Sequence, residues 1–319
     1  MAVTGAAAAL RAICITGPTG CGKTEAALAL ADELPLEIVS MDSALVYRGM
    51  DIGTAKPPPE VLRRYPHHLV DIREPEDTYS AGAFRIDAAA AAAAIRARGK
   101  WPLIVGGTLL YLRALREGLA ELPPRDERIR RALDAEAAAE GWEALHARLR
   151  AVDPVSAARI EPRDRQRIQR ALEVHALTGT PLADLTREPL RQSPKPEIET
   201  FALVPAERAE LKHRLERRFD AMIAAGFVEE VRRLRARPGL QAAHASMRSV
   251  GYRQIWAHLA GAYEWPEARR RAVAATRQLA KRQLTWLRSD DRCRALEAFD
   301  AGLASALRHG IAAVLDRWA

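Results

Sequence analysis

The sequence contains few residues of the kinds that cross-link small proteins or anchor proteins in membranes. Its 319 residues include only three cysteines, Cys14, Cys21 and Cys293, which form neither a CxxC pair nor a cluster with histidines. We therefore expect no disulfide framework or zinc site, and the three cysteines to be small buried or half-buried apolar residues. No run approaches the ~20 apolar residues that span a bilayer, and the N-terminus lacks the basic and apolar regions of a signal peptide. These absences predict a cytoplasmic protein that does not enter a membrane.

Aromatic residues are also scarce, at 5% of the chain, whereas alanine makes up about a fifth of it. Alanine has the highest helix propensity, so helices should dominate. The net charge is +8, but residues 1–120 are balanced, residues 121–195 carry +1 and residues 196–319 carry +7. Forty-three of the 49 basic residues are arginine, which suits phosphate and base recognition. A GC-rich genome would explain the arginine content but not its clustering in the last third.

Short apolar runs alternate with helical patterns in the first 120 residues. Such alternation predicts a parallel sheet covered by helices on both faces. Residues 43–66 are expected to be a loop. His67 and His68 are expected to be a pair of loop residues rather than a metal site. A long helix is expected over 81–98, with Ser80 as its N-cap. Strands are expected at 11–16, 36–41 and 102–105, with a short one at 68–72, and further helices at 22–33 and from Leu109.

The pattern changes after Pro124. Residues 125–185 have helical periodicity and no strand pattern, a proline-rich linker covers 187–197, Phe201–Val204 reads as a strand, and the remainder as helical. We therefore predict an α/β fold with a P-loop NTPase-like parallel sheet core and an all-helical insertion. The expected parts are 1–120 (first part of the core), 121–197 (insertion) and 198–319 (core continued, helical and basic).

One motif carries most of the chemistry. Residues 17–24 read GPTGCGKT and match G-x-x-x-x-G-K-[ST] between a predicted strand and helix. Backbone N–H groups of such a loop cradle phosphates at the helix N-terminus. Lys23 would add a point charge and Thr24 would hold Mg²⁺. The proposed diphosphate-binding residues are Gly17, Pro18, Thr19, Gly20, Cys21, Gly22, Lys23 and Thr24.

The P-loop lacks the acid that usually accompanies it. The strand at 102–105 ends in Gly106, Gly107 and Thr108, with no carboxylate. Asp42 instead follows the strand at 36–41. Because carboxyl ends of parallel strands point into the active crevice, Asp42 is a candidate metal ligand or general base. It could also simply cap the turn through Ser43.

The sequence resembles the bacterial tRNA dimethylallyltransferases, which are the tRNA isopentenyltransferase (IPP transferase) family. The resemblance runs from about residue 11 to residue 290. It is carried by residues 17–24, 42–45 (DSAL), 47–57 (YRGMDIGTAKP), 106–111 (GGTLLY), Asp153-Pro154, 164–174 (DRQRIQRALEV), 251–254 (GYRQ) and 275–288 (ATRQLAKRQLTWLR).

The resemblance implies an activity. A dimethylallyl group would pass from dimethylallyl diphosphate to N6 of the adenosine immediately 3′ of the anticodon, in tRNAs reading codons that begin with U. It implies Asp42 as general base, Thr108 as a hydrogen-bonding partner of the reacting region, and Arg218 as the arginine on the diphosphate, with the adjacent Arg217 as an alternative. Mg²⁺ bound through Thr24 would be the cofactor, and the chain would act as a monomer.

The same resemblance implies segments that contact the tRNA anticodon stem-loop, whose target base must leave its stack. Two helix faces support this through spacing alone: Arg163, Arg167 and Arg170, and Arg277, Lys281 and Arg288. The implied contacts are Asp42, Ser43, Ala44, Leu45, Thr108, Arg130, Gln166, Arg167, Ile168, Gln169, Arg170, Met247, Arg248, Ser249, Val250, Gly251, Tyr252, Ala280, Lys281, Arg282, Gln283, Leu284, Thr285, Trp286 and Leu287.

Two other functions fit parts of the sequence. A P-loop kinase of small molecules would use Asp42 as metal ligand or base, but would leave the basic C-terminal third and the insertion without a role. A non-catalytic RNA-binding protein would leave Asp42 and the Gly-Gly-Thr strand end unexplained. The prenyltransferase accounts for all of these features.

Overall fold

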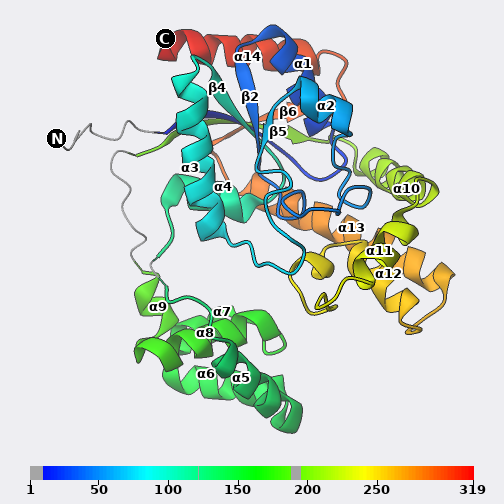
Figure 1. The fold of residues 1–319 in the computed structure, drawn as a ribbon. Helices are drawn as coiled ribbons and strands as arrows, with labels where there is room; N and C mark the ends of the chain where they lie inside the picture. The colour runs from blue at the N-terminus through cyan, green and yellow to red at the C-terminus, as the bar shows by residue number, and fades with distance from the viewer. Residues whose placement is uncertain (1–9, 121, 188–194) are drawn as a thin grey trace. The chain divides into compact units, whose positions relative to one another are not determined.

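The computed structural model describes residues 10–120, 122–187 and 195–319. It divides into two compact units, the first formed by residues 1–116 with 194–319 and the second by residues 117–193. The first unit holds a six-stranded sheet (Figure 1). The second is helical. No helix among the described residues is both long and apolar enough to cross a membrane.

The sheet of the first unit is parallel throughout, in the order β3-β2-β4-β1-β5-β6. This confirms the predicted α/β fold with a parallel sheet flanked by helices. Neighbouring residues of β1 alternate between two apolar cores, with Cys14 in one and Ile13 in the other, as a sheet buried on both faces requires. The strands are β1 (Arg11–Thr16), β2 (Leu36–Ser40), β3 (His67–His68), β4 (Trp101–Val105), β5 (Glu197–Val204) and β6 (Cys293–Glu297).

Helices cover both faces of this sheet. Phe84 of α3 and Leu112 of α4 belong to one core, whereas Leu30 of α1 and Leu307 of α14 belong to the other. Ser80 caps α3 by accepting a hydrogen bond from the Ala83 N–H, as predicted. The helices of this unit are α1 (Lys23–Glu33), α2 (Pro59–Arg64), α3 (Ala81–Ala97), α4 (Leu109–Glu117, whose last residue falls in the second unit), α10 (Arg208–Ala224), α11 (Phe227–Arg235), α12 (Tyr252–Leu259), α13 (Trp265–Arg288) and α14 (Leu303–Trp318), with a 3₁₀ turn at Ser246–Arg248.

The second unit packs its helices around its own apolar core, which includes Leu145, Leu149 and Ile168. A buried carboxylate, that of Glu173, lies beside this core and accepts hydrogen bonds from Arg130 and Arg170. Burial opposes its ionisation, but these donors outweigh burial and lower the pKa of Glu173 to about 2. The helices are α5 (Glu127–Glu140), α6 (Trp142–Val152), α7 (Pro154–Arg159), α8 (Arg165–Thr178) and α9 (Leu182–Leu185).

Several sequence predictions of local structure are wrong. The expected loop at 43–66 contains α2, because Pro59 stands in the first turn of a helix, where its missing N–H costs nothing. His67 and His68 form β3 instead of a loop, and the strand predicted at 68–72 stops at His68. The C-terminal segment is not all helical, because Cys293–Glu297 is β6. Its side chains are half-buried or exposed, as an edge strand permits, so it lacks the apolar pattern of a central strand.

Candidate active site

The P-loop forms the turn between β1 and α1. Gly20 and Gly22 have φ angles of 86° and 75°, which few residues other than glycine adopt, and α1 starts at Lys23. The Lys23 ammonium donates to the Pro18 carbonyl at 2.8 Å. Burial, with a smaller contribution from the nearby Arg218, lowers the pKa of Lys23 to about 8. Cys21, in contrast, points into the apolar core. The loop therefore offers backbone amides and one desolvated lysine to an anion.

Asp42 and Thr108 follow neighbouring strands, β2 and β4, and lie side by side. The Thr108 hydroxyl accepts a hydrogen bond from the Ser43 N–H at 3.1 Å. Asp42 Oδ1 accepts from the N–H groups of Ala44 at 2.7 Å and Leu45 at 3.3 Å. Asp42 thus holds the turn after its strand with one oxygen. Its other oxygen, Oδ2, has no hydrogen-bond partner among residues 10–120, 122–187 and 195–319.

The close approach of the two strand ends depends on a glycine. A Cβ atom at Gly106 would lie 2.0 Å from the Met41 carbonyl oxygen, a distance that no side chain tolerates. The Met41 N–H in turn donates to the Val105 carbonyl, and the Thr108 N–H donates to that of Met41. Gly106 is therefore explained by backbone contact between the strand that precedes Asp42 and the strand that precedes Thr108.

A cavity of about 1410 Å³ in the first unit joins these groups. Its polar lining includes Lys23, Thr24, Asp42, Thr108 and Arg218. Its apolar lining includes Leu215, Phe219, Met222, Phe227, Leu279 and Trp286. The cavity can hold an anion and a short hydrocarbon group together.

The geometry distinguishes the two candidate arginines of α10. Arg217 has a side chain that is 74% exposed and lies 3.7 Å from Glu210. Arg218 is half-buried, and burial lowers its pKa against the opposing effect of Asp42 and Glu25. Both arginines line the cavity, but it is Arg218 whose charge acts on Lys23 and is itself influenced by Asp42.

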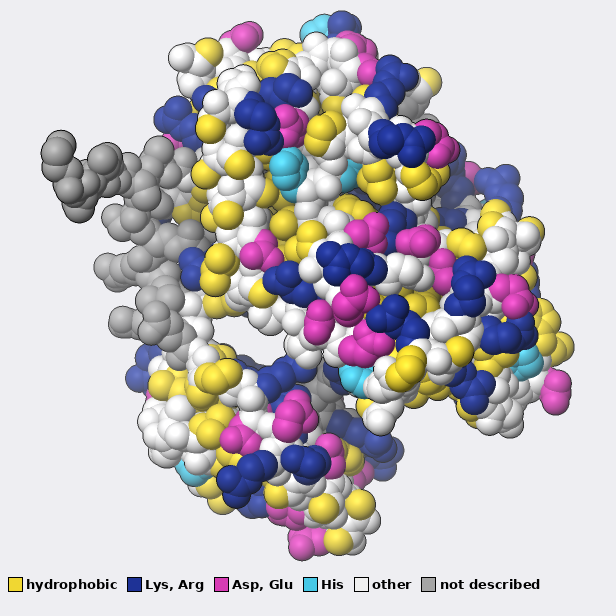
Figure 2. Space-filling view, viewed as in Figure 1, with side chains coloured by type: hydrophobic (Ala, Val, Ile, Leu, Met, Phe, Trp, Pro, Cys, Tyr) yellow, Lys and Arg dark blue, Asp and Glu magenta, His cyan; other side chains and the backbone are white. Residues whose placement is uncertain are grey.

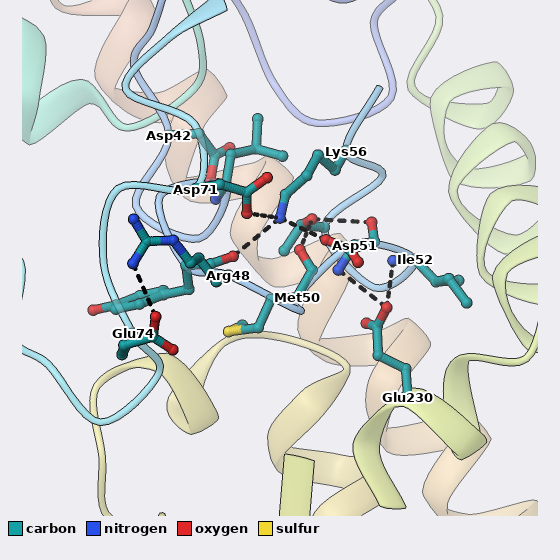
Figure 3. A network of polar contacts seen from close by, with 12 residues as sticks. Asp42, Arg48, Met50, Asp51, Ile52, Lys56, Asp71, Glu74 and Glu230 are labelled. Carbon is teal, nitrogen blue, oxygen red and sulfur yellow. Dashed lines mark hydrogen bonds and ion pairs between the residues drawn. The ribbon is translucent and has the colours of Figure 1, made fainter. Parts of the chain in front are cut away.

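The loop after Asp42 is held by two buried charged groups that the sequence did not single out (Figure 3). The Lys56 ammonium contacts the Tyr47 carbonyl at 3.0 Å, Asp51 at 2.6 Å and Asp71 at 2.5 Å. The carboxylate of Glu230, from α11, accepts hydrogen bonds from the backbone N–H groups of residues 51–53 and from the Tyr252 hydroxyl. Lys56 lies in a quoted motif, but no sequence signal separates Glu230 from an ordinary helix residue.

The segments expected to contact tRNA contain both exposed and buried residues. On α13, Lys281, Arg282 and Thr285 are exposed, whereas Ala280, Gln283, Leu284 and Leu287 are buried and Trp286 is half-buried. In the segment 247–252, Arg248 is exposed, Ser249 and Val250 are half-buried, and Met247, Gly251 and Tyr252 are buried. The buried side chains are shielded from the surface, so any contact with RNA in these segments depends on the exposed ones.

The same division holds in the second unit. Gln166 and Arg167 are exposed, Ile168 is buried, and Arg130, Gln169 and Arg170 are half-buried around Glu173. The predicted helix face of Arg163, Arg167 and Arg170 is wrong, because α8 begins at Arg165, after the N-cap Asp164. Arg163 lies before the helix and pairs with Glu143 at 2.8 Å.

Many basic side chains of the C-terminal third are paired with carboxylates. Figure 2 shows acidic and basic side chains intermixed over one face of the molecule. Arg277 pairs with Glu216, so the predicted face of Arg277, Lys281 and Arg288 loses one free charge. Among the residues that the structure describes, no carboxylate pairs with Lys281 or Arg282, and these two carry free positive charge. The other paired arginines of the C-terminal third include Arg232, Arg237, Arg269, Arg270 and Arg271.

Fold and site together define an α/β protein in which a P-loop, a carboxylate and apolar side chains line one cavity. The IPP transferase family model matches residues 45–290. The tRNA dimethylallyltransferase of Alkalilimnicola ehrlichii is 57% identical over 276 residues, which cover 86% of this chain and 87% of that protein. That of Burkholderia pseudomallei is 54% identical over 292 residues, covering 91% and 90%. The chain belongs to the IPP transferase family, and it is a prenyltransferase.

Solved structures agree. The full-length tRNA isopentenylpyrophosphate transferase of Bacillus halodurans is 34% identical, with a TM-score of 0.68 and coverage of 97% of this chain and 98% of that chain. A eukaryotic dimethylallyltransferase acting on tRNA shares the fold, with 24% identity, a TM-score of 0.73 and coverage of 94% and 77%. The kinase and the non-catalytic RNA-binding protein are therefore excluded as descriptions of this chain.

Proposed function

We propose that this enzyme transfers a dimethylallyl group from dimethylallyl diphosphate to N6 of the adenosine immediately 3′ of the anticodon, in tRNAs that read codons beginning with U. The products are N6-isopentenyladenosine and diphosphate. The observation that carries the proposal is the single cavity lined by a P-loop, an aspartate with an unpartnered oxygen and an apolar wall. Membership of the IPP transferase family supports it.

The residues divide the reaction between them. The P-loop amides, Lys23 and Arg218 bind the diphosphate and offset the charge that grows on it as the bond from oxygen to the allylic carbon breaks. The apolar wall takes the dimethylallyl group. An exocyclic adenine amine is a weak nucleophile, so Asp42 Oδ2 accepts an N6 proton while N6 bonds to the allylic carbon. Thr108 Oγ1 holds Ser43 in place and lines the same space.

Mg²⁺ fits the donors that are present. Thr24 is exposed at the start of α1, and its hydroxyl and the Asp42 carboxylate line the same cavity. Hydroxyl, carboxylate and phosphate oxygens are the ligands that Mg²⁺ prefers, with most of its shell left to phosphate and water. Thr24 would hold the ion against the diphosphate, where it would neutralise the charge of the leaving group.

The tRNA anticodon stem-loop is the proposed second substrate, bound by one chain acting as a monomer. Ser43, Ala44 and Leu45 lie beside Asp42 and Thr108 and would contact the flipped adenosine. Arg248, Lys281 and Arg282 would contact the backbone, as would Gln166 and Arg167 of the second unit. The test uses anticodon stem-loops with adenosine or guanosine 3′ of the anticodon. Product is expected only with adenosine, and equal prenylation at another adenosine would contradict the assigned position.

Substitution of Lys281 is expected to weaken tRNA binding in a salt-dependent way. Lys281→Ala removes one unpaired charge, so the affinity should fall and the slope of log K against log salt should become less negative by about 0.7 to 0.9. Filter binding from 50 to 200 mM KCl measures both. Arg269→Ala is the matched control, because Arg269 is already paired with Asp220. An unchanged slope in Lys281→Ala would remove that contact.

Diphosphate binding is expected to weaken with rising pH. The pKa of Lys23 is about 8 in the free protein, so the ammonium loses its proton as the pH rises through 8. The affinity for inorganic diphosphate with Mg²⁺, measured by calorimetry, should therefore fall by up to about tenfold per pH unit above 8. Lys23→Arg stays charged in this range and should bind more weakly but without that fall. Parallel profiles for the two proteins would show that Lys23 does not titrate at the site.

A further inference from the structure

The side-chain amide of Gln283 connects the two halves of the active site. Gln283 lies on α13 and is 8% exposed. Its Oε1 accepts a hydrogen bond from the Thr19 N–H of the P-loop at 3.0 Å. Its Nε2 donates to the Gly107 carbonyl at 2.8 Å. One planar group therefore spans the loop that binds diphosphate and the turn that carries Thr108.

The fit around this amide is tight. A Cβ atom at Gly107 would lie 2.4 Å from Gln283 Nε2 and 3.2 Å from the Gly17 carbonyl oxygen, so a larger residue there would push the amide out of its place. The backbone of α13 is fixed next to it, because Ala280 and Leu284 are packed in the apolar core. The packed helix α13 thus fixes the position of Gln283, whose side chain contacts both loops.

We propose that Gln283 is a positioning residue that sets the distance between the diphosphate site and the general base. This inference rests on the proposed function of the cavity. Transfer requires the allylic carbon, held through its diphosphate on the P-loop, to approach N6 beside Asp42 and Thr108. A shift of about 1 Å in such an approach can lower a rate by about 100-fold.

The chemistry of the side chain explains why glutamine stands here. The position needs one acceptor for the Thr19 N–H and one donor for the Gly107 carbonyl, and an amide supplies both. A glutamate carboxylate keeps the acceptor but offers no donor. A methionine has a similar length and supplies neither strong group. This role differs from a tRNA contact. Gln283 is buried, whereas its neighbours Lys281 and Arg282 are exposed and are better placed to contact tRNA.

The test compares Gln283→Met and Gln283→Glu with matched changes at Gln278, which is exposed on the same helix. Steady-state kinetics with dimethylallyl diphosphate and an unmodified anticodon stem-loop give kcat and KM, and filter binding gives the Kd for RNA. We expect Gln283→Met to lower kcat by about 10- to 100-fold with an unchanged Kd for RNA. Gln283→Glu should also lose turnover, while Gln278→Met and Gln278→Glu should stay within twofold of the unsubstituted enzyme.

Two results would overturn the proposal. If Gln283→Met lowered only the temperature of unfolding and kept kcat and KM, Gln283 would be a packing residue. If it weakened RNA binding and left turnover at saturating RNA unchanged, Gln283 would serve tRNA recognition. The unsubstituted enzyme tests the proposed function separately, through product formation. Should it form no product, calorimetry with inorganic diphosphate still tests the inference, because Gln283→Met should bind it at least fivefold more weakly than Gln278→Met.

Discussion

Replacement of Asp42 by asparagine is expected to lower kcat by about 10²- to 10⁴-fold, the usual contribution of a positioned general base. Asparagine keeps an oxygen to accept from the Ala44 and Leu45 N–H groups, so the turn after β2 should survive. What is lost is the second carboxylate oxygen, which would take the N6 proton. Single-turnover rates with saturating tRNA and dimethylallyl diphosphate measure the loss without interference from product release.

The control for this change is Asp316→Asn, because Asp316 is exposed on α14. It should leave both kcat and the Kd for tRNA unchanged. Asp42→Asn should also keep the Kd for tRNA within about twofold, since the loss belongs to the transition state. Turnover within threefold of the unsubstituted enzyme would show that Asp42 only holds its turn and that another group accepts the proton.

Replacement of Arg218 by glutamine is expected to lower kcat by about 10²- to 10³-fold. A half-buried guanidinium beside Lys23 stabilises charge on the departing diphosphate far more than an exposed one does, because little water screens it. The same substitution at Arg217 is the matched control. Its side chain is 74% exposed, so its charge is screened and the effect should stay below about tenfold.

The comparison of these two variants shows which of the two adjacent arginines stabilises the diphosphate, a question that the sequence leaves open. Kinetics with varied dimethylallyl diphosphate give kcat and KM for each. A larger loss in Arg217→Gln than in Arg218→Gln would reverse the assignment. Equal losses would indicate that the two arginines act together on the diphosphate and that the burial of Arg218 does not decide its role.

The sequence predicts the central architecture because its signals are local. The strands β1, β2 and β4 are short apolar runs bounded by turn residues, and the P-loop motif stands where a strand meets a helix. The Ser80 cap and the start of α4 also follow from neighbouring residues. Of the edge strands, β6 escapes prediction and β3 is predicted with the wrong bounds, because half-exposed edges need no apolar pattern.

The residues that support the site are harder to predict, since their partners are distant in the chain. Glu230 lies 177 to 179 positions from the amides that it accepts from, and Gln283 lies 264 positions from Thr19. Nothing in the local sequence distinguishes a buried glutamate or glutamine on an amphipathic helix from an exposed one. Spacing also overstates the RNA-facing charge, because it cannot show that Glu216 pairs with Arg277.

The most direct test of the whole account supplies unmodified tRNA, dimethylallyl diphosphate and Mg²⁺ to the purified protein. The RNA is then digested and its nucleosides are analysed by mass spectrometry. We expect N6-isopentenyladenosine from the position 3′ of the anticodon, one per tRNA, with Asp42→Asn giving a rate lower by about 10²-fold or more. Protein that binds both substrates but leaves the tRNA free of isopentenyladenosine would contradict it.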